Sequence, residues 1–177
     1  MTIDSPQQPA GTEPAPAGTE DTYAALIALL DRHQARYRVL EHAPEGRTEL
    51  VSALRGNELA QAAKCIILIV KLGKKRTRFV LAVVPGDKRV DVNRIRTLRR
   101  ATYVGFASTD VAERLAACVA GTVLPFALNE ELELIVDPEL LTHDTIYFNA
   151  ARLDRSLALA TADYVAIAKP VVEAIAA

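Results

Sequence analysis

Residues 64–86 read KCIILIVKLGKKRTRFVLAVVPG, and this stretch decides the fold. It holds two apolar runs rich in β-branched residues, 64–72 and 78–86, with a charged segment at 73–76 between them. Such runs favour strands, and a short polar connection that contains a glycine is typical of a hairpin. We therefore expect two neighbouring antiparallel strands within a sheet.

The chain on both sides of this hairpin alternates between helical and strand patterns. Apolar spacing predicts helices over residues 22–37, 47–63, 91–100, 108–120 and 161–177. The expected N-caps are Asp21 or Thr22, Asp91 and Ser108, with breaks at 56–57 and at Pro170. Further strands are predicted over residues 37–42, 102–106, 132–137, 145–149 and 156–161. The sequence thus indicates one domain of the α/β (α+β) class, with a mixed, largely antiparallel sheet of about seven strands surrounded by helices.

The two ends of the chain differ in composition. Residues 1–20 carry four of the nine prolines and little that could be buried, which is typical of a disordered tail. The folded domain is expected over residues 21–177. No run approaches the roughly 18 apolar residues of a membrane span, and the first 20 residues do not resemble a secretory signal. Cys65 and Cys118 both lie in apolar runs, which favours two free thiols in a cytoplasmic protein and leaves a disulfide as the alternative.

Charge is unevenly distributed along the chain. The net charge is −1, but residues 71–100 hold eleven Lys or Arg against only Asp87 and Asp91. This local charge of +9 leaves −10 for the remainder of the chain. A basic block on a hairpin tip and a short helix suits a polyanion such as RNA, although a merely solvated surface would have the same composition.

The common catalytic signatures are missing. The chain has no G-x-S-x-G, P-loop, G-x-G-x-x-G or H-E-x-x-H motif. His33, His42 and His143 do not pair with each other or with the cysteines at metal-ligand spacing, so we expect neither a metal nor a cofactor. Any hydrolysis would have to proceed without a metal and without an obvious protein nucleophile.

Two features could carry chemistry. Lys64 begins an apolar strand, where its ammonium either extends to water or enters a pocket that receives phosphate or carbonyl oxygen. Residues 121–125 form a G-x-x-x-P sequence after a helix, which is either a helix C-cap followed by a proline turn or a functional loop. The residue pattern alone leaves both alternatives open.

A family resemblance rests on five landmarks in a fixed order. These are AAK at 62–64, VVPGDKRVDVNRI at 83–95, GTVLPF at 121–126, LIVDPEL at 134–140 and YFNAARLDRSLAL at 147–159. Together they resemble the YbaK family, which includes the editing insertion of bacterial prolyl-tRNA synthetases and free-standing trans-editing proteins. Residues 148–170 are most similar to its free-standing YeaK-like subgroup.

The resemblance implies an aminoacyl-tRNA deacylase that acts on mischarged Ser-tRNA or Thr-tRNA. Ala-tRNA(Pro) or Cys-tRNA(Pro) as substrate, and a non-catalytic tRNA-binding module of the same fold, are the alternatives. The implied partners are tRNA and an aminoacyl-tRNA synthetase. An aminoacyl ester is already activated and has a ribose hydroxyl beside it, so the protein would only position the ester and stabilise the oxyanion.

The resemblance also implies roles for individual residues. Lys64 would hold the 3′-terminal nucleotide, and the loop from Gly121 to Pro125 would place the ester. The implied substrate-binding residues are His42, Thr122, Val123, Leu124, Asp137 and Asn149, and the basic hairpin would contribute tRNA contacts through Lys74, Lys75, Arg76 and Arg78. Asp137 could instead form a turn before Pro138, and His42 could be an ordinary loop residue. Ala127 and Ala151 replace frequent family glycines, which is expected either to narrow the pocket or to reduce backbone freedom.

Overall fold

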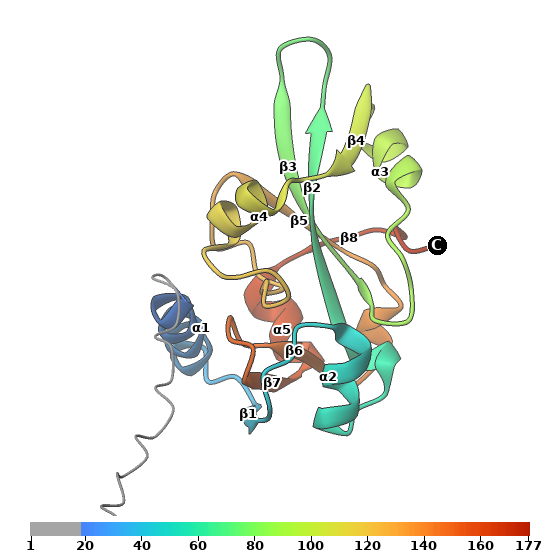
Figure 1. The fold of residues 1–177 in the computed structure, drawn as a ribbon. Helices are drawn as coiled ribbons and strands as arrows, with labels where there is room; N and C mark the ends of the chain where they lie inside the picture. The colour runs from blue at the N-terminus through green and yellow to red at the C-terminus, as the bar shows by residue number, and fades with distance from the viewer. Residues whose placement is uncertain (1–18) are drawn as a thin grey trace, which may run out of the picture.

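The computed structural model of the chain describes residues 19–177 (Figure 1). All but the last two residues of the predicted tail therefore lie outside the described part. Within residues 19–177 no helix is long and apolar enough to cross a membrane.

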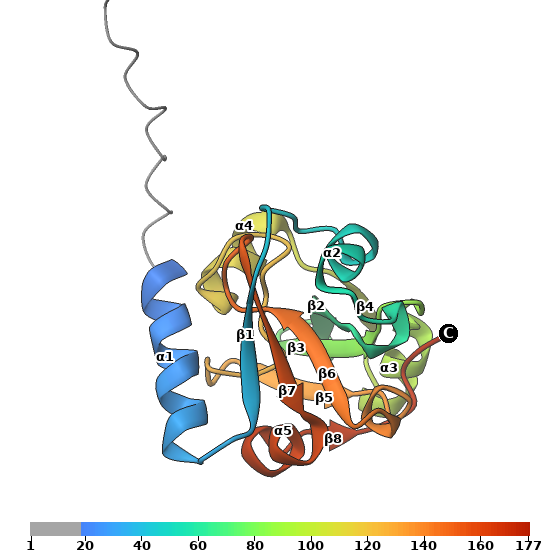
Figure 2. The same ribbon diagram turned by 90° about the horizontal axis from the view of Figure 1, so that it is seen from below.

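The described strands form two sheets. Their bounds are β1 Tyr37–Glu41, β2 Ala63–Lys71, β3 Thr77–Pro85, β4 Tyr103–Phe106, β5 Leu132–Val136, β6 Thr145–Asn149, β7 Arg155–Ala160 and β8 Val171–Val172. One sheet has the order β4-β2-β3-β5-β8, and the other has the order β1-β7-β6. All pairings are antiparallel except β3 with β5 and β5 with β8. The predicted mixed α/β fold is confirmed. Its strands form two sheets instead of one, and the three-stranded sheet packs across the central hairpin (Figure 2).

The central hairpin forms as predicted. β2 pairs with β3 from Ala63 opposite Pro85 to Lys71 opposite Thr77. The turn is closed by the Leu72 N–H, which donates to the Arg76 carbonyl at 2.8 Å. β4 and β5 pair on either side, so the hairpin is the middle of its sheet.

Helices flank the two sheets. Their bounds are α1 Thr19–Arg32, α2 Thr48–Arg55, α3 Val92–Arg99, α4 Thr109–Ala116 and α5 Thr161–Ala168, with 3₁₀ turns at Leu59–Gln61 and Leu140–Thr142. The Asp91 and Ser108 side chains cap α3 and α4 as predicted. The N-cap prediction for α1 was wrong, because the helix already begins at Thr19. The Thr22 hydroxyl instead donates to the Ala117 carbonyl at 2.6 Å.

The predicted C-terminal helix was wrong beyond Ala168. Lys169 adopts a left-handed conformation, and Pro170 lacks the N–H that a helix interior needs. Residues 171–172 then pair with β5 as a short parallel strand.

Two apolar clusters lie on opposite faces of the hairpin. Ile67, Leu81 and Val83 face the three-stranded sheet, α1 and α5. On the other face, Leu68 and Val84 pack with residues of α3 and the C-terminal segment. Alternation along β2 therefore decides which residues face the space between the two sheets, and that space opens at the start of β2.

Candidate functional site

A small pocket lies where the start of β2 meets α2, the end of β6 and two loops. Its volume is about 80 Å³. Of the residues that the sequence singled out, Lys64, Gly121, Val123 and Asn149 line this pocket. The remaining lining residues are Gly46, Thr48, Val51, Arg55, Ala62, Ala63, Cys65 and Phe148.

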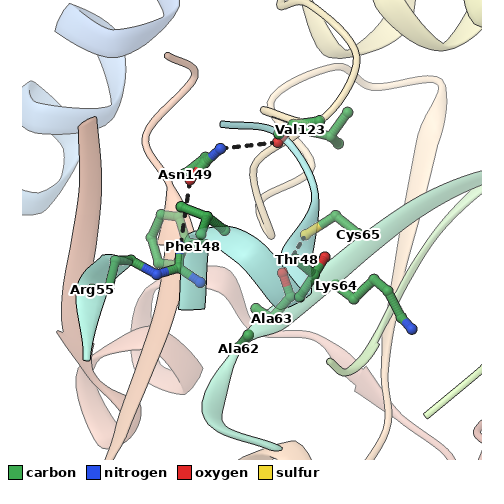
Figure 3. A pocket seen from close by; sticks show the side chains of 12 residues that line it. Thr48, Arg55, Ala62, Ala63, Lys64, Cys65, Val123, Phe148 and Asn149 are labelled. Atoms are coloured by element: carbon green, nitrogen blue, oxygen red, sulfur yellow. Dashed lines mark hydrogen bonds between the residues drawn. The ribbon is translucent and has the colours of Figure 1, made fainter. Parts of the chain in front are cut away.

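Lys64 contributes to the pocket wall, but its charge points elsewhere. Alternation places Ala63 and Cys65 on the face toward the other sheet and Lys64 on the opposite face. The ammonium donates to the Gly86 carbonyl at 3.3 Å and is directed away from Asn149 and Cys65 (Figure 3). Partial burial lowers the pKa of Lys64 below its ordinary value, because desolvation penalises the charged form.

The G-x-x-x-P loop reaches the pocket with two of its five residues. Gly121 and Val123 both line the pocket, and Gly121 has φ +85°, a conformation that favours glycine. The Thr122 hydroxyl is buried and donates to the Val119 carbonyl at 2.7 Å. Leu124 packs in the main core, and the Pro125 carbonyl accepts from the Tyr164 hydroxyl at 2.6 Å. These three residues hold the loop and do not line the pocket.

Asn149 ties the walls of the pocket together from the end of β6. Its Nδ2 donates to the Glu45 carbonyl at 2.8 Å and to the Gly121 carbonyl at 3.2 Å. Its Oδ1 lies 2.9 Å from the Ser156 hydroxyl, which in turn lies 2.7 Å from His42 Nε2. His42 thus does not line the pocket but is connected to Asn149 through Ser156.

Asp137 is placed away from the pocket. Its buried carboxylate accepts from the backbone N–H groups of Ile175 and Ala176, at 2.9 and 2.8 Å. Its other oxygen accepts from the Glu139 N–H at 2.9 Å, which is the turn geometry expected of an aspartate before a proline. Asp137 therefore fixes the C-terminal segment against β5.

The basic hairpin residues lie at the far end of β2. Lys74, Lys75, Arg76 and Arg78 are exposed, and no ion pair involves them within residues 19–177. About 23 Å of strand separates Lys64 from Lys71 at ~3.3 Å per residue, and the hairpin tip extends further (Figure 1). Three other cations of the block form ion pairs: Lys88 with Glu139, Arg94 with Asp91 and Arg99 with Glu133.

The sequence reasoning missed Arg55, Thr48 and Cys65. An arginine in the last turn of a helix, one residue before a glycine C-cap, is typical of a solvated charge at a helix end. Here the guanidinium is partly buried, and desolvation lowers the pKa of Arg55 to about 10. Burial also raises the pKa of the Cys65 thiol well above its ordinary value, so the thiol stays protonated.

Neither family departure narrows the pocket. Ala127 is exposed and Ala151 is buried in the core, and both lie outside the lining. Ala151 has φ +59°, which explains why glycine suits this position. Of the two expected effects, a reduced conformational freedom of the backbone therefore applies at Ala151.

The chemistry available at the pocket is limited. Among residues 19–177 no group of three or more His, Cys, Asp or Glu side chains could hold a metal ion. The pocket offers the Arg55 guanidinium, the Asn149 amide, the Thr48 hydroxyl and loop backbone, which suit a small substrate that is already activated.

The comparisons with known proteins agree with this class of site. The chain belongs to the aminoacyl-tRNA editing domain family, whose model matches residues 42–167. It is 38% identical to the multifunctional Ser/Thr-tRNA deacylase ProXp-y of Escherichia coli (strain K12). The 150 aligned residues cover 84% of this chain and 89% of the relative. It is also 28% identical to the proline–tRNA ligase of Bacillus licheniformis. The 127 aligned residues cover 67% of this chain and 21% of the ligase.

Solved structures share the fold. A hypothetical protein superposes with a TM-score of 0.77 at 23% identity, over 86% of this chain and 99% of its own. A protein proposed to be a trans-editing enzyme for prolyl tRNA synthetase gives a TM-score of 0.73 at 18% identity, over 88% and 97% of the two chains.

Proposed function

We propose that this protein hydrolyses the ester of mischarged aminoacyl-tRNA, with Ser-tRNA or Thr-tRNA as substrate. The observation that carries the proposal is the small pocket built by the start of β2, the Gly121 loop and Asn149. Its volume of about 80 Å³ suits a small amino acid. The relationship to a Ser/Thr-tRNA deacylase supports the same assignment.

The loop backbone is the proposed oxyanion stabiliser. Gly121 and Val123 line the pocket, and their N–H groups have no acceptor within residues 19–177. Two such donors could receive the charge that develops on the ester oxygen as water attacks. The ribose hydroxyl next to the ester would orient that water, so no protein nucleophile is required.

Lys64 and the hairpin are the proposed contacts to tRNA. The Lys64 ammonium is held on the face of β2 that points away from Asn149, where it could bind a phosphate of the terminal nucleotides while the ester enters the pocket. Lys74, Lys75, Arg76 and Arg78 would bind phosphates further along the tRNA.

Thr48 is the proposed reader of the substrate side chain. It lines the pocket and is partly exposed there, so its hydroxyl is available to a substrate. A site that bonds a substrate hydroxyl discriminates strongly against an analogue that lacks it. This favours serine and threonine over alanine.

A panel of mischarged tRNAs tests the proposal. Ser-tRNA and Thr-tRNA should be deacylated faster than Ala-tRNA(Pro) and Cys-tRNA(Pro), and the Thr48→Val variant should lose most of the preference for Ser-tRNA over Ala-tRNA. Preferential hydrolysis of Ala-tRNA(Pro) or Cys-tRNA(Pro) would contradict the substrate assignment. Binding of tRNA without hydrolysis would make the protein a non-catalytic module.

The proposed activity also sets the proposed location and partners. Aminoacyl-tRNA is made and used in the cytoplasm, which is where we place the protein. An aminoacyl-tRNA synthetase is a further proposed partner, because a related segment occurs within a proline–tRNA ligase.

A further inference from the structure

Arg55 is a partly buried cation whose hydrogen-bond partners are all uncharged. Its Nε donates to Asn57 Oδ1 at 3.0 Å, and its Nη2 donates to Ser52 Oγ at 3.3 Å. Its Nη1 lies 3.4 Å from Asn149 Oδ1 and 3.2 Å from Ser156 Oγ. No ion pair to Arg55 occurs within residues 19–177. Partial burial of a guanidinium without a carboxylate costs free energy of desolvation, so a specific use for its N–H groups is expected.

The use that the contacts indicate is to orient the Asn149 carboxamide. An amide can be turned by 180° without changing its shape, so its donors and acceptors decide which end points where. Arg55 can only donate, and it faces Oδ1. Nδ2 is thereby directed away from Arg55, to the carbonyls of Glu45 and Gly121.

Ser156 cannot provide this orientation by itself. Its hydroxyl has one proton and lies within hydrogen-bond distance of both Asn149 Oδ1 and His42 Nε2. His42 Nδ1 faces the Ala43 carbonyl at 2.9 Å, which can only accept, so Nδ1 carries a proton. The one Ser156 proton can go either to Asn149 Oδ1 or to His42 Nε2, whereas the Arg55 N–H faces Asn149 Oδ1 in both cases.

The orientation matters because the two carbonyls belong to the two loops of the pocket. A Cβ placed on Gly121 would lie 2.9 Å from the Cα of Gly46, so the two loops touch backbone to backbone. Both glycines line the pocket. The Asn149 amide bonds both loops, to Glu45 on one side and Gly121 on the other.

We propose that Arg55 is a positioning residue of this pocket, which fixes the Asn149 carboxamide and through it the junction of the 45–46 and 121–123 loops. The consequence for hydrolysis rests on the proposed function, since the Gly121 loop supplies the proposed oxyanion donors. The consequence for Asn149 does not depend on it.

The first arm of the test needs no tRNA. The Asn149 side-chain amide signals, assigned by their loss in Asn149→Ala, are followed by hydrogen exchange in NMR spectra of the full chain. Arg55→Ala should accelerate this exchange by roughly tenfold, which corresponds to one lost hydrogen bond to a charged donor. Arg36→Ala is the matched control, because Arg36 is exposed and pairs with Asp163 away from the pocket.

The second arm is a double-mutant cycle on deacylation of Ser-tRNA. Arg55→Ala and Asn149→Ala should each lower kcat by up to about a hundredfold with little change in KM, because a displaced loop misplaces the donors. The double variant should lose no more than either single variant, since both break one link. Arg36→Ala should leave both constants unchanged.

The outcomes separate the two proposals. Unchanged Asn149 exchange in folded Arg55→Ala, or additive losses in the cycle, would overturn the role of Arg55. A wild-type protein that hydrolyses no mischarged tRNA would refute the proposed function, while the exchange arm would still decide on Arg55. If Arg55→Ala does not fold, Arg55→Lys replaces it. One ammonium cannot donate to all four acceptors of the guanidinium, so hydrogen exchange of the Asn149 amide should still be faster than in wild type. An unchanged exchange rate in Arg55→Lys would overturn the proposal.

Discussion

Lys64 and Gly86 are joined across the β2–β3 hairpin, where the lysine ammonium donates to the glycine carbonyl at 3.3 Å. The two residues come from separate sequence landmarks, AAK and VVPGD. Antiparallel pairing of Ala63 with Pro85 brings these landmarks side by side. The hairpin therefore orients the lysine, and Gly86 has a part in the site that its own sequence context does not reveal.

The first prediction concerns the charge of Lys64. Lys64→Ala should reduce deacylation of mischarged tRNA by orders of magnitude while the protein stays folded, because a partly exposed lysine adds little to core packing. Lys64→Arg should also fail, since a planar fork does not replace a compact ammonium. Single-turnover kinetics and thermal unfolding of each variant provide the measurement. An active, folded Lys64→Ala enzyme would refute the role assigned to Lys64.

The second prediction concerns the close packing of Gly86. A Cβ at this position would lie 2.5 Å from the Leu59 carbonyl oxygen and 2.9 Å from Thr48 Cγ2, so the backbone beside the pocket would have to move. Gly86→Ala should therefore destabilise the fold by about 1–3 kcal/mol and lower deacylation. Denaturant unfolding measures the first effect.

Gly105→Ala is the matched control for Gly86→Ala. The added methyl group would meet the hydroxyl end of the Tyr103 side chain, which is exposed and can turn away. Its cost should stay within about 0.5 kcal/mol. Equal destabilisation by both variants would show that the packing of Gly86 is not special.

The third prediction concerns the left-handed Ala151. Replacing it with glycine relieves strain of about 1–2 kcal/mol, but it also removes a buried methyl group worth about 0.8 kcal/mol and makes the unfolded chain freer. These effects nearly cancel, so Ala151→Gly should lie within about 1 kcal/mol of wild type. Ala150→Gly has the same losses without the relief, because Ala150 is equally buried and has no positive φ. It should be less stable than Ala151→Gly by ~1–2 kcal/mol in urea unfolding; equal stabilities would mean that Ala151 is not strained.

The sequence predicted local structure well where one pattern dominated. The β-branched runs gave the hairpin, and the caps at Asp91 and Ser108 gave the starts of two helices. The C-terminal segment was misread because VVEAIAA has helical spacing, whereas its actual structure depends on pairing with β5 and on the carboxylate of Asp137. Such long-range contacts override local propensity.

The site was only partly predictable for the same reason. Lys64, Gly121 and Asn149 were found through a family pattern, and the fold does bring them to one pocket. Arg55 was missed, because its burial results from the packing of α2 against the end of β6 and not from its neighbours in sequence. A local pattern cannot distinguish an arginine that lies in solvent at a helix end from one that is partly buried in the wall of a pocket.

The last prediction tests the hairpin as the surface that binds tRNA. Lys74, Lys75 and Arg76 are exposed at the tip, more than about 23 Å from Lys64 along the strand, so they can bind phosphates without touching the ester. Binding should weaken with salt at a log–log slope of about −0.7 to −0.9 per phosphate neutralised. Replacing all three with Ala should flatten the slope and raise KM while leaving kcat nearly unchanged, because lost uniform binding does not alter the chemical step. The matched control replaces Arg32, Arg38 and Lys169, which are exposed outside the basic block and remove the same charge. If both triple variants keep the wild-type slope, the hairpin does not bind tRNA; if both flatten it equally, net charge and not the hairpin governs association.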